Sequence, residues 1–297
     1  MYGNGHLRLS AMMGTYPKTA PLKSGAITPP SCELAFDDVD VAQKAFKAAV
    51  RDLKYDVTEI AIVTFLQAFA TGKPYVLLPF VMNGNFHHGS VLKRAGDELD
   101  PAGLVGRRAA MRAYSQTTPT WVRGILSDDY GVRVESVRWL SQEGAHVAEY
   151  REPSWVQTVP SGSSLEDMLL SGEVDAIIAS GLGGNPKLEP LIPEPKKAAL
   201  AWYERHHAVP INHMVAVRRE LAEARPDVVK DLYAALKESR RTGESPPAGA
   251  GPDLQPSGFR AVRPAVELIV RYAAEQQLIP EAYPIDSLFG KVLEAVG

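Results

Sequence analysis

The sequence reads RAYSQTTPTWVRGILSDDYGV over residues 112–132, and this stretch decides the fold. Thr118 is a favourable N-cap, and Pro119 suits the first position of a helix, where its missing N–H costs no hydrogen bond. An apolar stripe at helical spacing follows, and Gly131 stands where a left-handed cap is favoured. Because RRAAMRA (107–113) is typical of a strand, the stretch predicts a strand followed by a helix over about 118–130.

Polar side chains crowd around the start of this helix, and one of them would be enough to cap it. The surplus predicts a helix N-terminus that receives an anion such as a carboxylate. The free N–H groups of Thr120 and Trp121 would form the cradle together with nearby hydroxyls. The polar residues concerned are Ser115, Gln116, Thr117, Thr118 and Thr120. The alternative is a solvated, Thr-rich turn.

The bulk composition is that of an ordinary globular protein. The chain has 297 residues, of which 45% are hydrophobic and 23% charged, and this length predicts two lobes rather than one. The formal net charge of −3 argues against nucleic acid and membrane surfaces as partners. Cys32 is the single cysteine, which excludes an intrachain disulfide and a thiolate metal cage.

Expected strands and helices alternate along the chain. YVLLPFVM (75–82) is a continuous apolar run typical of a buried parallel strand, and HHGSVLKR (87–94) predicts another strand, in which His87 and His88 would point to opposite faces. Residues 226–241 and 263–279 predict amphipathic helices. Between them, TGESPPAGAGPDLQPSG (242–258) predicts a surface loop. The alternation indicates an α/β fold with mainly parallel sheets flanked by helices.

Several segments occur in the order found in the type II periplasmic-binding-protein fold. They are YDVTEIAIVTFLQAF, YVLLPFV, FHHGSVLKR, the stretch 104–132, LEDMLLSGEVDAIIA and VPINHMVAVRREL. The resemblance implies two α/β lobes with a cleft between them. The first lobe would consist of residues 1–89 and 211–297, and the second of residues 90–210. A ligand of such a fold would bind in the cleft.

More narrowly, the chain resembles the 4,5-dihydroxyphthalate decarboxylase family over residues 6–290. The densest match includes Tyr114, Thr117, Trp121–Gly124 and Asp128–Val132. The resemblance implies an aromatic-acid decarboxylase that acts on a hydroxylated phthalate or benzoate. LQPSGF (254–259) departs from the family pattern, which leaves room for another lyase of the same fold.

Such a reaction needs an acid that protonates the ring carbon before carbon dioxide leaves, and a group that takes the proton of a para hydroxyl. His88 and His213 are the candidates, since histidine titrates near neutral pH. The alternative for His88 is a packed histidine bonded to backbone. Glu59 would orient a histidine or accept the phenolic proton. The alternative is a residue in the first turn of a helix, whose carboxylate interacts favourably with the helix dipole.

Substrate binding is assigned to the crowded helix start and its surroundings. The residues expected to contact the substrate are Tyr114, Ser115, Thr117 and Thr118. Trp121 would pack against the aromatic ring of the substrate or belong to the core. Arg8 and Arg123 would be counter-charges, although Arg123 could instead form an ion pair with Asp128 or Asp129.

We expect no cofactor, because no histidine pair has the spacing of metal ligands. The binding of a divalent metal is kept as an alternative. The N-terminal residues lack the pattern of a signal peptide, so we expect a cytoplasmic protein. The partner would be a small aromatic carboxylate, and a homodimer is allowed. The rival function is a solute-binding protein of an ABC-type transporter, which the same fold permits.

Overall fold

The computed structural model describes residues 2, 5–160, 162, 164–182, 184–244 and 251–297. The chain divides into two compact units. Unit 1 consists of Met1–Gly84, Ile211–Glu267 and Tyr283–Gly297, and unit 2 consists of Asn85–Pro210 and Leu268–Ala282. The boundaries predicted from the sequence put all of 211–297 in the first lobe, whereas residues 268–282 cluster with unit 2.

Unit 1 combines elements from both ends of the chain. Its described strands are β1 (Leu7–Met12), β2 (Cys32–Phe36), β3 (Val57–Ala61), β4 (Tyr75–Gly84) and β11 (Ile211–Arg218). Its helices are α1 (Ala20–Lys23), α2 (Phe46–Arg51), α3 (Ile62–Ala70), α7 (Arg219–Ala224), α8 (Pro226–Gly243), α10 (Ile285–Phe289) and α11 (Val292–Val296), with a 3-10 turn at Ala42–Ala45. Helix α9 (Phe259–Glu275) begins in unit 1, and its last residues cluster with unit 2.

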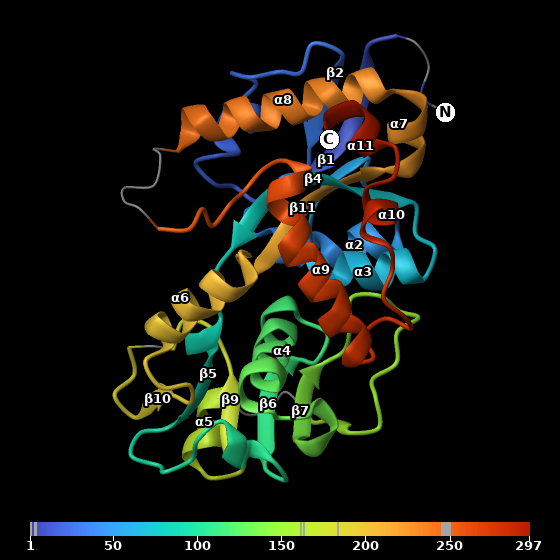
Figure 1. Ribbon diagram of the computed structural model, residues 1–297. Helices are drawn as coiled ribbons and strands as arrows, with labels where there is room; N and C mark the ends of the chain where they lie inside the picture. The colour runs from blue at the N-terminus through green and yellow to red at the C-terminus, as the bar shows by residue number, and fades with distance from the viewer. Residues whose placement is uncertain (1, 3–4, 161, 163, 183, 245–250) are drawn as a thin grey trace. The chain divides into compact units, whose positions relative to one another are not determined.

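The sheet of unit 1 has the order β2-β1-β3-β11-β4 in the part of the chain that the structure describes. Helix α8 lies along one face, where Val228, Val229 and Leu232 belong to the same buried apolar cluster as Leu9 and Val215 of the sheet. Helices α2 and α3 lie on the opposite face (Figure 1). The strong period of α8 is the reason for this packing, because its apolar stripe must be buried. Residues 245–250 of the loop predicted over 242–258 lie outside the described residues.

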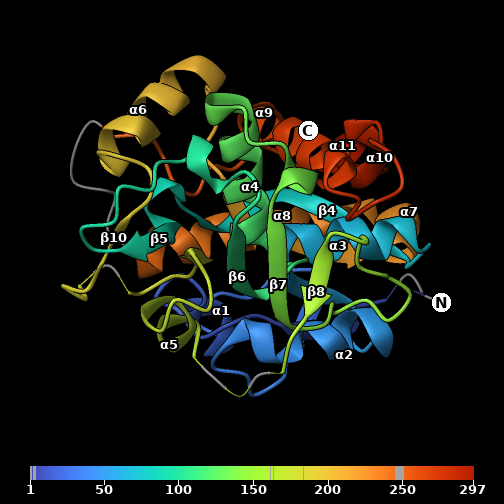
Figure 2. The same cartoon turned by 90° about the horizontal axis from the view of Figure 1, so that it is seen from below.

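Unit 2 contains the strands β5 (Val91–Arg94), β6 (Arg108–Ala113), β7 (Arg138–Glu143), β8 (Val156–Thr158), β9 (Ala176–Ile178) and β10 (Leu188–Pro190). Its α-helices within the described residues are α4 (Thr117–Tyr130), α5 (Leu165–Leu170) and α6 (Pro195–His206), with 3-10 turns at His88–Ser90, Ala102–Leu104 and Val134–Ser136. The strand order is β10-β5-β9-β6-β7-β8. Helices α4 and α5 lie on opposite faces of this sheet (Figure 2), with α5 against β5, β6 and β9.

Both sheets are mainly parallel, as predicted, but each contains one reversed strand among those described, β11 in unit 1 and β5 in unit 2, and is therefore mixed. Strands β1, β2 and β3 pair in parallel, as do β6, β7, β8 and β9. Every antiparallel pair among the described strands involves β5 or β11. These strands follow the two points, after Gly84 and after Pro210, at which the chain passes between the units. Apolar periodicity does not encode the direction of a strand, so the sequence could not reveal this mixing.

The decisive helix is α4, and its N-cap lies two residues earlier than predicted. Gln116, not Thr118, is the N-cap residue, with φ −69° and ψ 148°. The end is as predicted, because Gly131 adopts a left-handed conformation with φ 66°. The predicted strand over 87–94 is only partly correct: His88–Ser90 form a 3-10 turn, and β5 starts at Val91. Neither His87 nor His88 lies in a strand, so the alternation expected of strand residues does not apply to them, and both are buried.

Candidate active site

Glu59 and His213 form a buried pair in unit 1. Oε1 of Glu59 lies 2.7 Å from Nδ1 of His213. The Glu59 residue is 0% exposed and His213 is 6% exposed. A carboxylate only accepts hydrogen bonds, so this contact places a proton on Nδ1 and directs Nε2 away from Glu59. Nε2 makes no hydrogen bond with the residues that the structure describes, and it is therefore the nitrogen available for proton transfer.

The Glu59 carboxylate is fully engaged by the protein. The backbone N–H of Gly14 donates to Oε2 at 2.9 Å, and the Tyr16 hydroxyl donates to Oε1 at 3.1 Å. Burial and the nearby Glu59 charge raise the pKa of Tyr16, which keeps its hydroxyl protonated as a donor. Glu59 lies within strand β3 and not in a helix, so the alternative of a helix-dipole residue is wrong. These contacts favour a carboxylate that orients His213.

A local irregularity of β11 accompanies His213. The pairing of β11 with β4 shifts register between Ile211 and His213, between His213 and Met214, and again before Ala216. Such irregularities re-aim side chains and are common beside active sites. The ring of Phe46 meets the His213 ring edge to face at a centroid distance of 5.1 Å. The bulged strand, Glu59 and Phe46 together fix the orientation of the imidazole.

His88 belongs to unit 2 and lies among aromatic rings. It is 1% exposed, and both ring nitrogens are buried without a hydrogen-bond partner among the described residues. Its ring centroid lies 6.1 Å from Trp202 and 6.4 Å from Phe86. Burial, with a smaller effect of the Arg205 charge, lowers the pKa of His88 to about 4. The imidazole is thus neutral near pH 7. The alternative of a histidine bonded to backbone is wrong, because neither ring nitrogen has a hydrogen-bond partner among the described residues.

His213 and His88 lie in different units, so the idea that they face each other stays a prediction. His206 and His207 end helix α6, where His206 stacks on Trp202 at 4.6 Å and His207 is exposed. No group of three or more histidine, cysteine, aspartate or glutamate side chains that could hold a metal ion gathers in the described part of the chain.

Arg123 is a buried cation that contacts neutral groups. Its guanidinium carbon lies 3.9 Å from the centre of the Tyr114 ring. Nη2 donates to the Tyr114 carbonyl at 2.7 Å, and Nε donates to Oε1 of Gln276 at 2.8 Å. Complete burial lowers the pKa of Arg123. These contacts join the end of β6, helix α4 and the segment after α9.

The ion pair considered for Arg123 is wrong, because both candidate carboxylates have other partners. Asp128 pairs with Arg271 at 2.5 Å, and Asp129 pairs with Arg205 at 2.7 Å. These arginines lie on α9 and α6, and no local sequence pattern indicates that these helices pack next to α4.

The predicted carboxylate cradle is altered at its start. The backbone N–H of Thr120 donates to the Gln116 carbonyl at 3.1 Å, so this N–H is not free and that part of the prediction is wrong. Ser115 and Thr117 are buried and Thr118 is half-buried. Trp121 is 0% exposed and meets Trp202 and Tyr272 edge to face, at 6.1 and 5.7 Å. These contacts favour the core alternative for Trp121.

Arg8 lies on β1 with its side chain 74% exposed, and it pairs with Glu33 on β2 at 3.3 Å.

Sequence reasoning missed two residues of unit 1, Tyr16 and Lys18. Both lie in a turn-rich passage without periodicity, and only their tertiary contacts reveal them.

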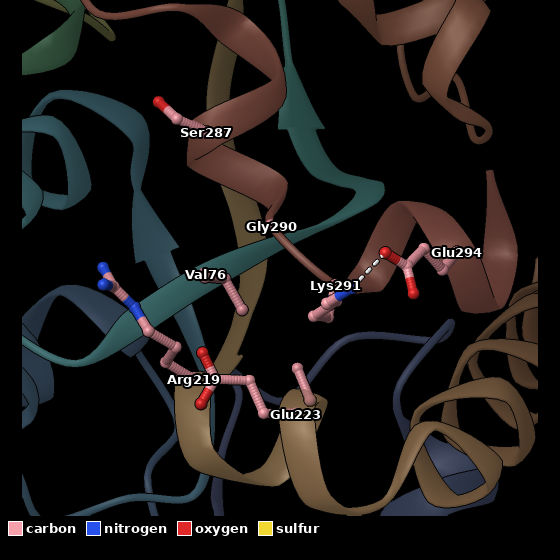
Figure 3. A pocket seen from close by; sticks show the side chains of 8 residues that line it. Val76, Arg219, Glu223, Ser287, Gly290, Lys291 and Glu294 are labelled. Carbon is pink, nitrogen blue, oxygen red and sulfur yellow. Dashed lines mark hydrogen bonds and ion pairs between the residues drawn. The ribbon is translucent and has the colours of Figure 1, made fainter.

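A pocket of unit 1 with a volume of about 300 Å³ lies between β4, α7, α10 and α11 (Figure 3). Arg219 and Glu223 come from α7, Ser287 from α10, and Lys291 pairs with Glu294 at α11. None of the residues assigned to catalysis or substrate binding lines it.

Similar proteins agree with the resemblance found in the sequence. A comparison with models of protein families finds no match. The chain is 29% identical over 254 residues to a curated 4,5-dihydroxyphthalate decarboxylase of Comamonas testosteroni, covering 79% of this chain and 75% of that protein. It is 29% identical over 217 residues to a second one, of Pseudomonas putida, covering 66% of this chain and 81% of that protein.

Solved structures show the fold. A putative sulfonate-binding protein of an ABC transporter from Methylobacillus flagellatus has a TM-score of 0.54 and 11% identity, covering 99% of this chain and 94% of its own. The desulfurization enzyme DSZB has a TM-score of 0.52 and 15% identity, covering 97% and 98%. The described residues contain no helix long and apolar enough to cross a membrane. The chain is thus a relative of the 4,5-dihydroxyphthalate decarboxylases, and it has the periplasmic-binding-protein fold.

Proposed function

We propose that this chain is an aromatic-acid decarboxylase that acts on a hydroxylated phthalate or benzoate. The observation that carries the proposal is the buried Glu59–His213 pair, with 2.7 Å between Oε1 and Nδ1. A carboxylate that orients an imidazole and stabilises its charged form is a recurrent arrangement for general acid–base catalysis. The similarity to two curated 4,5-dihydroxyphthalate decarboxylases supports the same reaction class.

The chemistry follows from the ring and from the pair. A hydroxyl para to a carboxylate pushes electron density onto the ring carbon that carries this carboxylate. The His213 imidazolium donates its Nε2 proton to that carbon. The bond to the carboxylate then breaks, its electrons restore the aromatic ring, and carbon dioxide leaves. Solvent returns a proton to His213, and Glu59 stabilises the charged imidazole before the transfer.

We assign the para hydroxyl to His88. With a pKa of about 4, this imidazole is neutral near pH 7 and can accept a hydrogen bond from the hydroxyl. Because almost none of it carries the second proton near pH 7, we assign protonation of the ring carbon to His213 instead. Thr117 and Thr118 at the start of α4 stay the proposed contacts for a substrate carboxylate.

The test measures carbon dioxide release from a panel of hydroxylated phthalates and benzoates in deuterated water. We expect release from 4,5-dihydroxyphthalate, with one deuterium on the product ring at the vacated position. Phthalate without hydroxyls should not react, because its ring lacks the electron push. Recovery of every ligand unchanged, with tight binding of one of them, would instead support the solute-binding alternative.

A further inference from the structure

Lys18 carries a buried ammonium group that the proposed reaction does not use. The residue is 8% exposed, and Nζ lies 2.6 Å from Oε1 of Gln255 and 3.4 Å from Oε1 of Glu244. An ammonium has three N–H donors, so one of them has no partner among the residues that the structure describes. Burial lowers the pKa of Lys18, while the Glu244 carboxylate opposes this shift. A buried cation with an unused donor is suited to an anion.

Lys18 lies beside the Glu59–His213 pair. Its Nζ is 5.6 Å from the centre of the Tyr16 ring, and the Tyr16 hydroxyl donates to Glu59. The Glu59 charge also reaches Lys18 and favours its protonated form. The ammonium, the tyrosine and the pair therefore belong to one region of unit 1.

The backbone that carries Lys18 is firmly held. The Ser239 hydroxyl donates to the Lys18 carbonyl at 2.7 Å. At Gly243, near the end of α8, a Cβ atom would lie 1.9 Å from the Pro17 carbonyl oxygen, so only glycine permits this close approach. A binding group works best when its supporting residues fix it in advance.

Arg240 adds a second cation to this region. Its Nη1 donates to the Gln255 carbonyl at 2.5 Å and its Nη2 to the Val81 carbonyl, while Nε is buried without a partner among the described residues. The carboxylates nearby are Glu244 and Asp253. Glu244 is 3.4 Å from Lys18, and Asp253 is exposed and accepts the Gln255 N–H at 2.8 Å. Neither is a short partner of the Lys18 ammonium.

We infer that Lys18, held by Gln255, binds the carboxylate that stays on the ring and so selects a diacid over a monoacid. This inference rests on the proposed function, in which a phthalate carries two carboxylates and loses one of them. The retained carboxylate would take the unused N–H of Lys18, and Glu244 would lose its long contact. The preference for a diacid then comes from a charge-assisted hydrogen bond that a monoacid cannot make.

The test measures binding of phthalate and benzoate by calorimetry, which requires no turnover. The wild-type protein should prefer phthalate. Lys18→Met should weaken phthalate binding by on the order of 10- to 100-fold, the equivalent of one hydrogen bond to a charged group, and leave benzoate binding nearly unchanged. Lys18→Arg should keep most of the preference. Lys23→Met is the matched control, because Lys23 donates to Thr15 at 2.7 Å and is bonded elsewhere.

Circular dichroism should first verify that the variants fold, and Lys18→Gln replaces Lys18→Met if the latter does not. Three outcomes would overturn the inference: Lys18→Met weakens binding of both ligands equally, Lys18→Met leaves phthalate binding unchanged, or the wild-type protein does not prefer phthalate. If the wild-type protein releases no carbon dioxide but loses its phthalate preference in Lys18→Met, the decarboxylase proposal fails and the role of Lys18 stands. If it releases carbon dioxide without preferring phthalate, the role of Lys18 fails and the decarboxylase proposal stands.

Discussion

Glu59 and His213 meet on a diagonal of the sheet and not as directly opposed residues. In the antiparallel pairing of β3 with β11, Glu59 opposes Val215 and His213 opposes Ala61, yet Oε1 and Nδ1 are 2.7 Å apart. Diagonal neighbours lie within reach of long side chains. The pair therefore depends on the register of β3 and β11, since a slip of one residue would turn the side chains to opposite faces.

Glu59→Gln should lower kcat by about 10²- to 10⁴-fold with little change in KM, and His213→Ala should do the same. The amide keeps the shape of Glu59 but cannot stabilise a charged imidazole. The double variant should be little worse than the worse single variant, because the two residues act as one unit. Steady-state kinetics of carbon dioxide release checks all three variants.

The matched control for Glu59→Gln is Glu33→Gln, since Glu33 is an exposed strand carboxylate paired with Arg8. It should keep normal kcat. A near-normal kcat in both Glu59→Gln and His213→Ala would place the acid elsewhere in the protein.

Unit 2 should become less stable as the pH falls from about 6.5 to about 4. The unfolded chain protonates His88 near its ordinary value of 6.5, whereas burial lowers the folded pKa to about 4. Between these values the unfolded state binds more protons, so the stabilisation present above pH 6.5 is lost as the pH falls. The loss amounts to about 2–3 kcal/mol.

His88→Leu should remove this part of the pH dependence. All four tryptophans, Trp121, Trp139, Trp155 and Trp202, lie in unit 2, so their fluorescence during urea unfolding reports this unit. The free energy of unfolding of the wild type minus that of His88→Leu should be constant above pH 6.5 and should decrease below it. A difference that is independent of pH would contradict the low pKa of His88.

Arg123→Met should lower the free energy of unfolding of unit 2 by about 2–4 kcal/mol, because it leaves the Tyr114 carbonyl and Oε1 of Gln276 without a donor. If Arg123 acts only through these contacts, the folded variant should keep the wild-type KM. A large rise in KM without loss of stability would instead support the role of substrate counter-charge predicted from the sequence.

Gly124→Ala should destabilise unit 2 by about 1–3 kcal/mol. A Cβ atom at this position would lie 2.3 Å from Cδ2 of Tyr272, and the Tyr272 ring is tied by its hydroxyl to Asp128 at 2.7 Å. Gly144→Ala is the control, because no atom lies within 4 Å of the Cβ it would add. Tryptophan fluorescence during urea unfolding compares the free energies of unfolding of the two variants. Equal values would show that the Tyr272 ring moves aside at little cost.

The sequence predicted those parts of the fold that local chemistry determines. Gly131 ends α4 because a left-handed cap favours glycine, and the apolar run 75–82 is the buried strand β4. The α/β class followed from alternating periods and from the resemblance to a known family. Glu59 and His213 were named separately, but no local rule indicated that they touch.

The rest depended on contacts between distant parts of the chain. Tyr16 reaches Glu59 across 43 positions, and Lys18 reaches Gln255 across 237. Neither Tyr16 nor Lys18 stands in a periodic segment, so their burial had no sequence signal. Thr118 was named as the N-cap because its side chain suits that role, whereas the backbone of Gln116 turns first.

The position of β11 determines the order in which the two sheets can close during synthesis. In the order β2-β1-β3-β11-β4, strand β4 is bonded to the rest of its sheet only through β11, residues Ile211–Arg218. The strands of unit 2 all lie between Val91 and Pro190, so their sheet can form before β11 leaves the ribosome. Until then the apolar strand β4 has no partner and is exposed to aggregation. Unit 1 is thus the unit whose synthesis begins first and whose sheet closes last.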